Sequence, residues 1–204
     1  MLFTWGVFSL TARISMRKLK NSELDRKAIR EFKETRKYPI VLVLDNVRSL
    51  NNVGAAFRTS DAFLIEGIYL CGITARPPHR EIHKTALGAT DSIHWEYYGN
   101  TRDAVDVLKK SGYTVISIEQ AEESIALPEF KPIESGKYAL VFGHEVKGVQ
   151  QSVVDISDCC VEIPQYGTKH SFNISVSIGI VLYHFYYQLN HQEVSYSLKR
   201  DKGY

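Results

Sequence analysis

The sequence predicts an α/β fold: a single doubly wound, mostly parallel sheet with helices on both faces. Apolar runs of four to eight residues alternate with helical stretches, which is typical of parallel strands that are buried on both sides. The composition is ordinary for a globular protein, with 44% hydrophobic and 24% charged residues, and excludes collagen-like, disordered and coiled-coil classes. A chain of 204 residues can bury one full core without disulfides or a structural metal.

The predicted elements follow one another in a regular order. Ser22 and Asp25 form a capping-box pattern that opens a basic helix, and Pro39 stops this helix after Lys37. Strands are expected at 40–45, 67–72, 93–97, 113–119, 138–143 and 160–164. Helices are expected at 52–63, 83–87, 102–110 and 173–190, and an irregular connection at 126–137.

Four segments divide the chain. Residues 1–15 are expected to be a leader outside the fold and are not a signal peptide, because a basic start and a cleavage site are missing. Residues 16–38 are expected to form a basic N-terminal helical arm, 39–192 the α/β domain and 193–204 a polar tail. Met16 begins a more ordinary amino terminus, which leaves open whether the leader belongs to the native protein.

The composition favours a cytoplasmic location. Three cysteines, two of them adjacent, cannot form a disulfide framework. No apolar run reaches the roughly 18 residues that a membrane-spanning helix needs. We therefore expect a reducing compartment and no membrane partner.

Positive charge is concentrated near the amino terminus. Residues 13–37 hold ten basic and four acidic side chains, whereas the net charge of the whole chain is only +2. Such an arm is typical of a surface that neutralises phosphates, although a solvated helix that serves only solubility is the alternative. The four arm cations expected to contact phosphate are Arg26, Lys27, Arg30 and Lys33.

Three polar loops follow predicted strands, at the edge where doubly wound sheets bind ligands. Their sequences are DNVRSLNNVGAAFRTSDAF, FGHEVKGV and IPQYGTKHSFNIS. Neither a G-x-G-x-x-G turn nor a G-x-x-x-x-G-K-[ST] loop occurs in the chain, which argues against dinucleotide and nucleotide-triphosphate binding.

Each loop offers candidate residues that also have a purely structural interpretation. Asn52 is either a helix cap or a functional group, whereas Arg58, on the apolar segment GAAF, needs an anion or a carboxylate partner. Gly143 and Gly148 bracket Glu145 in a turn through which a ligand can approach the backbone. In the third loop, the polar groups that precede the last helix either cap it or act on a ligand.

Metal and nucleophile sites are weaker alternatives. His79 and His83 are spaced i, i+4, but no H-E-x-x-H motif is formed and no cysteine lies nearby. Ser171 follows His170 without a G-x-S-x-G elbow, and Cys71 ends a buried strand, where cysteines usually pack. We therefore expect no metal, and a hydrolase is a distant alternative.

Together, three segments in these loops resemble a known family. NNVGAAFRTSDAF, LVFGHEVKGV and IPQYGTKHSFNISVSIGIVLYHF are similar to motifs 1, 2 and 3 of the SpoU (TrmH) family of SPOUT-class RNA methyltransferases, over about Ile40 to Asn190. The sequence departs from the family at Phe172, where leucine is usual, and an apolar contact is kept. The resemblance implies S-adenosylmethionine as cofactor, methylation of a ribose 2′-oxygen in tRNA or rRNA, a homodimer and a C-terminal trefoil knot.

The resemblance also implies roles for individual residues. The positions that match the family's catalytic residues are Asn52, Arg58, Glu145, Ser171 and Asn173. Those that match its cofactor pocket are Gly143, Gly148, Ile163, Gly167 and Phe172. A catalytically silent RNA-binding protein on the same fold is the alternative function. The arm cations are assigned to RNA under either function.

Arg58 has two alternative chemical roles. The family proposal makes this arginine the base that takes the proton of the 2′-hydroxyl. A guanidinium pKa above about 12 makes its neutral form scarce at pH 7. We therefore expect Arg58 to clamp a phosphate and to stabilise the developing alkoxide.

The last predicted helix indicates an assembly. Its apolar residues between Ile174 and Leu189 do not keep to one face, and a helix that is apolar all round is buried all round. We expect its second face to contact another subunit in a homodimer, and burial under the basic arm is the alternative.

Overall fold

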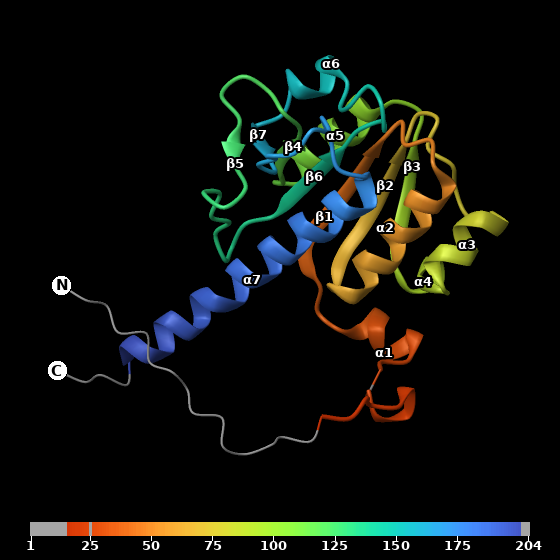
Figure 1. The fold of residues 1–204 in the computed structure, drawn as a ribbon, viewed down its shortest axis with the longest axis vertical. Helices are drawn as coiled ribbons and strands as arrows, with labels where there is room; N and C mark the ends of the chain where they lie inside the picture. Colours follow the sequence, from red (N-terminus) through yellow and green to blue (C-terminus); the bar gives the residue numbers. More distant parts are fainter. Residues whose placement is uncertain (1–15, 25, 201–204) are drawn as a thin grey trace.

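The computed structural model describes residues 16–24 and 26–200, with side chains placed up to Asn190. A seven-stranded sheet forms its centre, in the order β3-β2-β1-β6-β4-β7-β5 (Figure 1), and all its strand pairs in the described chain are parallel. The strands are β1 Tyr38–Asp45, β2 Ile65–Cys71, β3 His94–Tyr98, β4 Thr114–Ile118, β5 Ile125–Ala126, β6 Tyr138–Phe142 and β7 Cys159–Glu162. The predicted mostly parallel sheet is confirmed.

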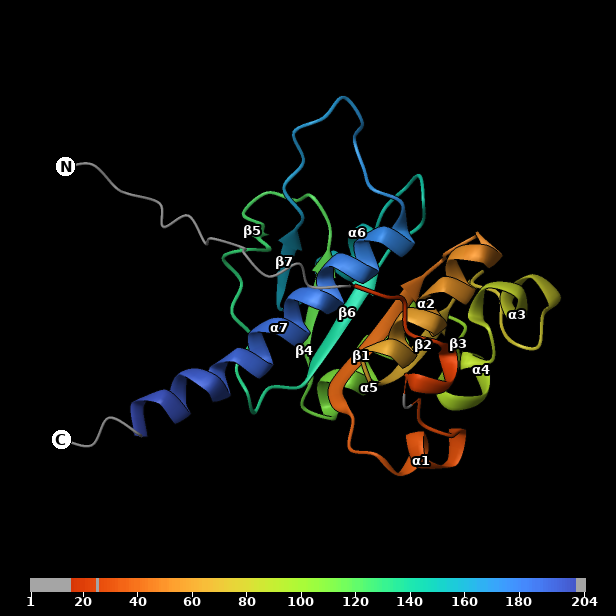
Figure 2. The same ribbon diagram turned by 60° about the horizontal axis from the view of Figure 1, so that its bottom comes forward.

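Helices cover both faces of the sheet, as a doubly wound fold requires. One face carries α2 (Leu50–Ala62), α3 (Arg80–Ala86), α4 (Ala89–Ser92) and α7 (Ile174–Arg200). The other face carries α5 (Thr101–Lys110) and α6 (Gln151–Val154). Figure 2 shows the connection from β7 to α7 standing out from one end of the sheet. The knot that the resemblance implies stays a prediction.

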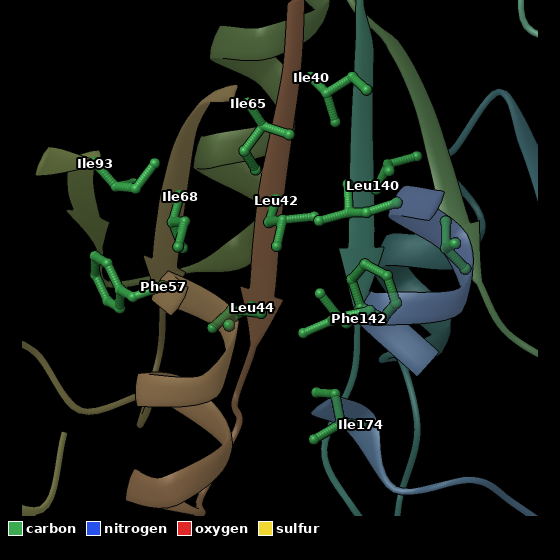
Figure 3. Packing of buried hydrophobic residues seen from close by; sticks show 14 of the residues in the cluster. Ile40, Leu42, Leu44, Phe57, Ile65, Ile68, Ile93, Leu140, Phe142 and Ile174 are labelled. Atoms are coloured by element: carbon green, nitrogen blue, oxygen red, sulfur yellow. The ribbon is translucent and has the colours of Figure 1, made fainter. Parts of the chain in front are cut away.

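The central strand β1 divides the core into two layers. Ile40, Leu42 and Leu44 point to the face of α2 and α7 (Figure 3), whereas Val41 and Val43 point to the face of α5. All five are at most 3% exposed, and each such side chain contributes about 1.5–3 kcal/mol by burial. Burial on both sides explains why this strand is an unbroken apolar run in the sequence.

The basic arm differs from the single helix that was predicted over 22–37. It contains a 3-10 turn at Asn21–Glu23 and the short helix α1 at Ile29–Glu34. The turn is closed by Glu23, which accepts a hydrogen bond from the Lys20 amide at 2.7 Å. Ser22 lies inside this turn and α1 begins only at Ile29, so Ser22 does not open the helix as predicted. Asp25, the other residue of the predicted capping box, lies outside the described residues. Short charged helices are marginal without packing, and Phe32 is the buried residue of α1.

Several boundaries also differ from the predictions. The helix α2 begins at Leu50 because Ser49, not Asn52, caps it. The helix α3 begins earlier than predicted because His79 caps it. The short elements β5, α4 and α6 were not predicted, and α7 continues to Arg200, past the predicted end at 190. The proposed leader, residues 1–15, lies outside the described residues.

The topology places the three polar loops at one edge of the sheet. Because the strands are parallel, all their carboxyl ends lie at the same edge of the sheet. The chain order reverses where β1 and β6 are neighbours, which is the switch point where such sheets bind ligands. Within the described residues, no helix is long and apolar enough to cross a membrane.

Candidate active site

A cavity of about 590 Å³ lies at the carboxyl ends of β4, β6 and β7. Its size falls within the range of small-molecule sites. It is lined by the strand ends, by the turn 143–148 and by residues 170–174, which lead into α7. The second and third predicted loops therefore meet around one cavity, which we call the first cavity.

The wall formed by residues 143–148 is a tight turn that needs both glycines. His144 and Gly148 exchange two backbone hydrogen bonds, of 3.0 and 2.8 Å between nitrogen and oxygen. A Cβ atom on Gly143 would lie 2.1 Å from the backbone of Gly148 and Val149, and Gly148 has a φ of +67°. The two glycines predicted from their spacing thus let the chain fold back on itself at the cavity.

Glu119, directly after β4, holds this turn in place. Its carboxylate accepts a hydrogen bond from the Val149 amide at 2.9 Å, and it lines the first cavity. A Cβ atom on Gly148 would lie 2.1 Å from the same carboxylate. Sequence reasoning missed Glu119, although an acidic residue directly after an apolar strand was a usable signal.

Glu145 connects the turn to the loop that precedes α2. Its carboxylate accepts hydrogen bonds from the amides of Arg48 (3.0 Å) and Ser49 (2.9 Å) and from the side-chain amide of Asn52 (3.1 Å). Burial alone raises the pKa of Glu145, but these hydrogen bonds outweigh it and hold the pKa below its ordinary value of 4.5. Glu145 is therefore ionised at neutral pH, and it holds motifs 1 and 2 together.

Asp45, at the end of β1, fixes the far side of the turn. This fully buried carboxylate accepts hydrogen bonds from the Thr101 hydroxyl (2.5 Å), the Gln150 amide (2.8 Å) and the Gln150 side chain (2.7 Å). A buried charge with such partners is compatible with a stable fold. Sequence reasoning gave Asp45 no role of its own, although it both ends the predicted strand 40–45 and begins the first polar loop.

The third loop supplies the rim of the first cavity. Ser171, Phe172 and Asn173 line it and are exposed. The Asn173 side-chain oxygen accepts hydrogen bonds from the Ser175 amide at 2.9 Å and the Ser175 hydroxyl at 2.6 Å, at the start of α7. Ile163 also lines the cavity, whereas Gly167 is exposed and does not.

Arg58 lies apart from this group. It is exposed on α2 and forms no hydrogen bond or ion pair with any residue in the described part of the chain. Six residues separate it from Asn52, which turns its side chain about 120° away around the helix. The anionic partner that the sequence demands is not supplied by the described residues of the same chain.

The arm cations are all exposed. Lys27 pairs with Glu31 at 2.9 Å and Arg30 with Glu34 at 3.0 Å. Exposed i, i+4 pairs such as these stabilise a helix by only about 0.3–0.5 kcal/mol, so they exchange readily for a phosphate. The arm is attached to the domain through Phe32, which packs into the core.

Cys71 and His79, the other candidate reactive groups in the sequence, both have structural roles in the fold. Burial raises the pKa of Cys71 to about 12, so its thiol is protonated and unreactive at neutral pH. His79 uses its Nδ1 atom to accept the Glu81 amide at 3.2 Å. Among the described residues, no group of three or more His, Cys, Asp or Glu side chains is placed to hold a metal ion.

These features define a class of protein: a doubly wound α/β domain with a glycine-bounded cavity at the carboxyl ends of β4, β6 and β7, on one side of its switch point. Comparison with known proteins then gives the family. Residues 39–183 match the SpoU rRNA Methylase family, and the chain belongs to it. The resemblance seen in the three motifs is confirmed.

Individual relatives agree with this assignment. The chain is 32% identical over 162 residues to a tRNA (guanosine(18)-2′-O)-methyltransferase of Aquifex aeolicus, covering 77% of this chain and 73% of the relative. A crystal structure of the A. aeolicus TrmH/SpoU tRNA modifying enzyme superposes with a TM-score of 0.72 and 27% identity, over 81% of this chain and 82% of that one. An AdoMet-bound rRNA methyltransferase from Sinorhizobium meliloti gives a TM-score of 0.69 and 25% identity, over 78% of this chain and 60% of that one.

Proposed function

We propose that this protein transfers a methyl group from S-adenosylmethionine to the 2′-hydroxyl of a ribose in tRNA or rRNA. The observation that carries the proposal is the first cavity, where the glycine turn of motif 2 meets the polar rim of motif 3. Glu145 ties the same turn to motif 1. Motifs 2 and 3 therefore line one cavity, and a hydrogen bond from Asn52 ties motif 1 to its wall.

The first cavity fits S-adenosylmethionine in size and charge. Its volume of about 590 Å³ suits a ligand of nucleoside and amino-acid parts, and its lining includes the carboxylates of Glu119 and Glu162, which favour a cation. Gly143, Gly148, Ile163 and Phe172 would hold the cofactor, with Gly167 shaping the loop. The cofactor, when bound, supplies an electrophilic methyl group.

The chain's own groups aim the acceptor oxygen. Ser171 forms no hydrogen bond to another described residue, and the side-chain oxygen of Asn173 is occupied by Ser175. The Ser171 hydroxyl and the Asn173 side-chain nitrogen are therefore left to orient a ribose at the rim. Fixing the attacking oxygen in line accounts for a large part of the barrier reduction in such displacements.

Arg58 stabilises charge in this proposal. Its exposed guanidinium has no partner in the described chain and is available to an RNA phosphate and to the developing alkoxide. Because the guanidinium stays protonated at neutral pH, we assign the stabilising role and not that of the base. Asn52 and Glu145 fix the helix that carries it.

The RNA also contacts the arm. The four arm cations are exposed on a segment docked beside α4, and phosphate contacts by such side chains add affinity without reading sequence. We propose a cytoplasmic location because the free cysteines fit a reducing compartment and the substrate is RNA.

We also propose that the protein is a homodimer. The helix α7 buries Ile178 and Phe185 against its own sheet but exposes Val176, Tyr183 and Tyr187 along the opposite stripe. Tyr183 is 58% exposed, and a contiguous exposed apolar stripe is typical of an interaction surface. A second copy of α7 would cover this stripe.

One assay tests the function. The purified protein is incubated with total RNA and S-adenosylmethionine that carries a tritiated methyl group. We expect label in tRNA or rRNA and, after alkaline hydrolysis, a gap in the cleavage ladder, because a 2′-O-methyl group removes the internal nucleophile. RNA binding without transfer would instead support the catalytically silent alternative.

A further inference from the structure

A second cavity, of about 610 Å³, lies at the carboxyl ends of β2 and β3. Its lining includes Ile73, Arg76, Trp95 and Tyr97, none of which belongs to the three motifs. Ile73 is 64% exposed and Tyr97 is 39% exposed. The site therefore presents apolar and aromatic surface to solvent at the same edge of the sheet as the first cavity.

Arg76 and Tyr97 form a preassembled stack in this cavity. The Arg76 guanidinium carbon lies 4.2 Å from the centroid of the Tyr97 ring, and the Tyr97 hydroxyl donates to the Gly72 carbonyl at 3.0 Å. Within the described residues, Arg76 has no carboxylate partner. Its guanidinium lies over the ring, and its N–H groups have no acceptor in this part of the chain.

Arg76, which lines the second cavity, favours an anionic ligand there. Arg76 and Arg80 lack ion-pair partners among the described residues, whereas Lys84 has Glu81 at 3.9 Å. An arginine side chain beside an aromatic ring is a surface on which an unpaired RNA base stacks. The N–H groups of the same guanidinium suit a phosphate.

Hydrogen bonds fix the second cavity relative to the first. The Ile73 amide donates to the Asn46 side chain at 3.1 Å, and the Val47 amide donates to the Thr74 hydroxyl at 2.9 Å. The next residues of that loop are bound by Glu145. Strands in a sheet are about 4.8 Å apart, so the ends of β2 and β3 lie about 10–15 Å from that of β6.

We propose that the second cavity binds an unpaired nucleotide of the substrate RNA close to the methylated one, with its base stacked on the Arg76–Tyr97 pair. The proposal rests on the proposed RNA methylation and adds a subsite to it. It follows that the target ribose is delivered from a single-stranded or loop region, since a paired base cannot enter the stack.

Binding of a fluorescein-labelled oligoadenylate, followed by anisotropy, tests the subsite. We expect Tyr97→Leu and Arg76→Gln to weaken binding at least about fivefold, as loss of one stacked base does. Tyr97→Phe keeps the ring and should bind like the wild type. Lys110→Gln, which removes an exposed charge at the end of α5, is the matched control and should have little effect.

Three results would overturn the subsite. The first is that Tyr97→Leu and Arg76→Gln bind the oligoadenylate as tightly as the wild type. The second is that Arg76→Gln loses no more affinity than Lys110→Gln, and the third is that both cavity variants lose as much affinity for a double-stranded RNA of the same charge. Calorimetry with S-adenosylmethionine shows that each variant is folded, and exposed Arg76 gives a usable variant if Tyr97→Leu does not fold. Methyl transfer by the wild type is measured in parallel, so that failure of the proposed function is recognised separately.

Discussion

The turn at Gly143 offers the sharpest test of the first cavity. In Gly143→Ala, the added methyl group would lie 2.1 Å from the backbone of Gly148 and Val149, where ordinary contacts begin near 3.5 Å. Neither neighbour can rotate away, because both contacting groups are main-chain atoms. The turn must therefore open by more than about 1 Å.

The size of the effect follows from the bonds that opening breaks. His144 and Gly148 exchange two backbone hydrogen bonds, and Glu119 binds the Val149 amide. At about 1 kcal/mol for a neutral bond and about 1.5–3 kcal/mol for one to a carboxylate, the loss is about 2–4 kcal/mol if most of them break. Since the cavity wall moves as well, affinity for S-adenosylmethionine should fall by at least about tenfold.

Two measurements check this prediction against a matched control. Urea unfolding reports the free energy of unfolding, and calorimetry reports cofactor affinity. Gly99→Ala is the control, because a Cβ atom there would meet nothing within 4 Å, and we expect wild-type behaviour from it. If Gly143→Ala binds the cofactor as tightly as Gly99→Ala does, the turn is not part of the cofactor site.

Four further predictions follow. Arg58→Lys keeps the charge but loses the planar fork, so turnover should fall at least about a hundredfold while calorimetric cofactor affinity is unchanged; near wild-type turnover would make Arg58 structural. Glu145→Gln should lower the free energy of unfolding by about 1–3 kcal/mol above pH 5. Because the Glu145 pKa is depressed, its stabilisation is lost as pH falls below 4.5, so the two unfolding curves should converge there, and a pH-independent gap would refute this. Val176→Asp should give monomers by light scattering, whereas Val107→Asp, also exposed but on α5, should stay dimeric; a wild-type monomer contradicts the dimer. Replacing the four arm cations by glutamine should weaken RNA binding and flatten its salt dependence, and an unchanged slope would mean that the arm is only a solvated surface.

The strands of the sheet could be predicted because their burial shows in the local sequence. A strand buried on both faces must be apolar at every position, so β1 and β6 stand out in the sequence without knowledge of their neighbours. The arm could not be predicted in the same way. Its charged residues are compatible with one long helix, but only packing determines which part is helical, and Phe32 is the residue of α1 that is buried.

The site was predicted in part for a similar reason. The turn glycines can be recognised because their spacing around Glu145 is a local pattern. The contacts of Glu119 and Asp45 could not, since their partners lie 30 and 105 residues away along the chain, although the place of Glu119 directly after an apolar strand marked it as a candidate. Only the folded sheet brings them under the turn. Arg58 is the opposite case. Its place on an apolar segment predicted an anionic partner, but the described residues supply none.

The end of β1 and the loop that follows it hold three parts of the carboxyl edge of the sheet in place. Asp45 holds Gln150 behind the glycine turn, Asn46 holds Ile73 at the second cavity, and the amides of Arg48 and Ser49 bind Glu145. The wall of the first cavity and the proposed nucleotide subsite are therefore held by the same short segment, residues 45–49. A disturbance of this loop must affect both cavities together, whereas the arm, anchored elsewhere through α1, can alter RNA affinity alone. Separating these two kinds of defect experimentally distinguishes RNA capture from placement of the ribose beside the methyl group.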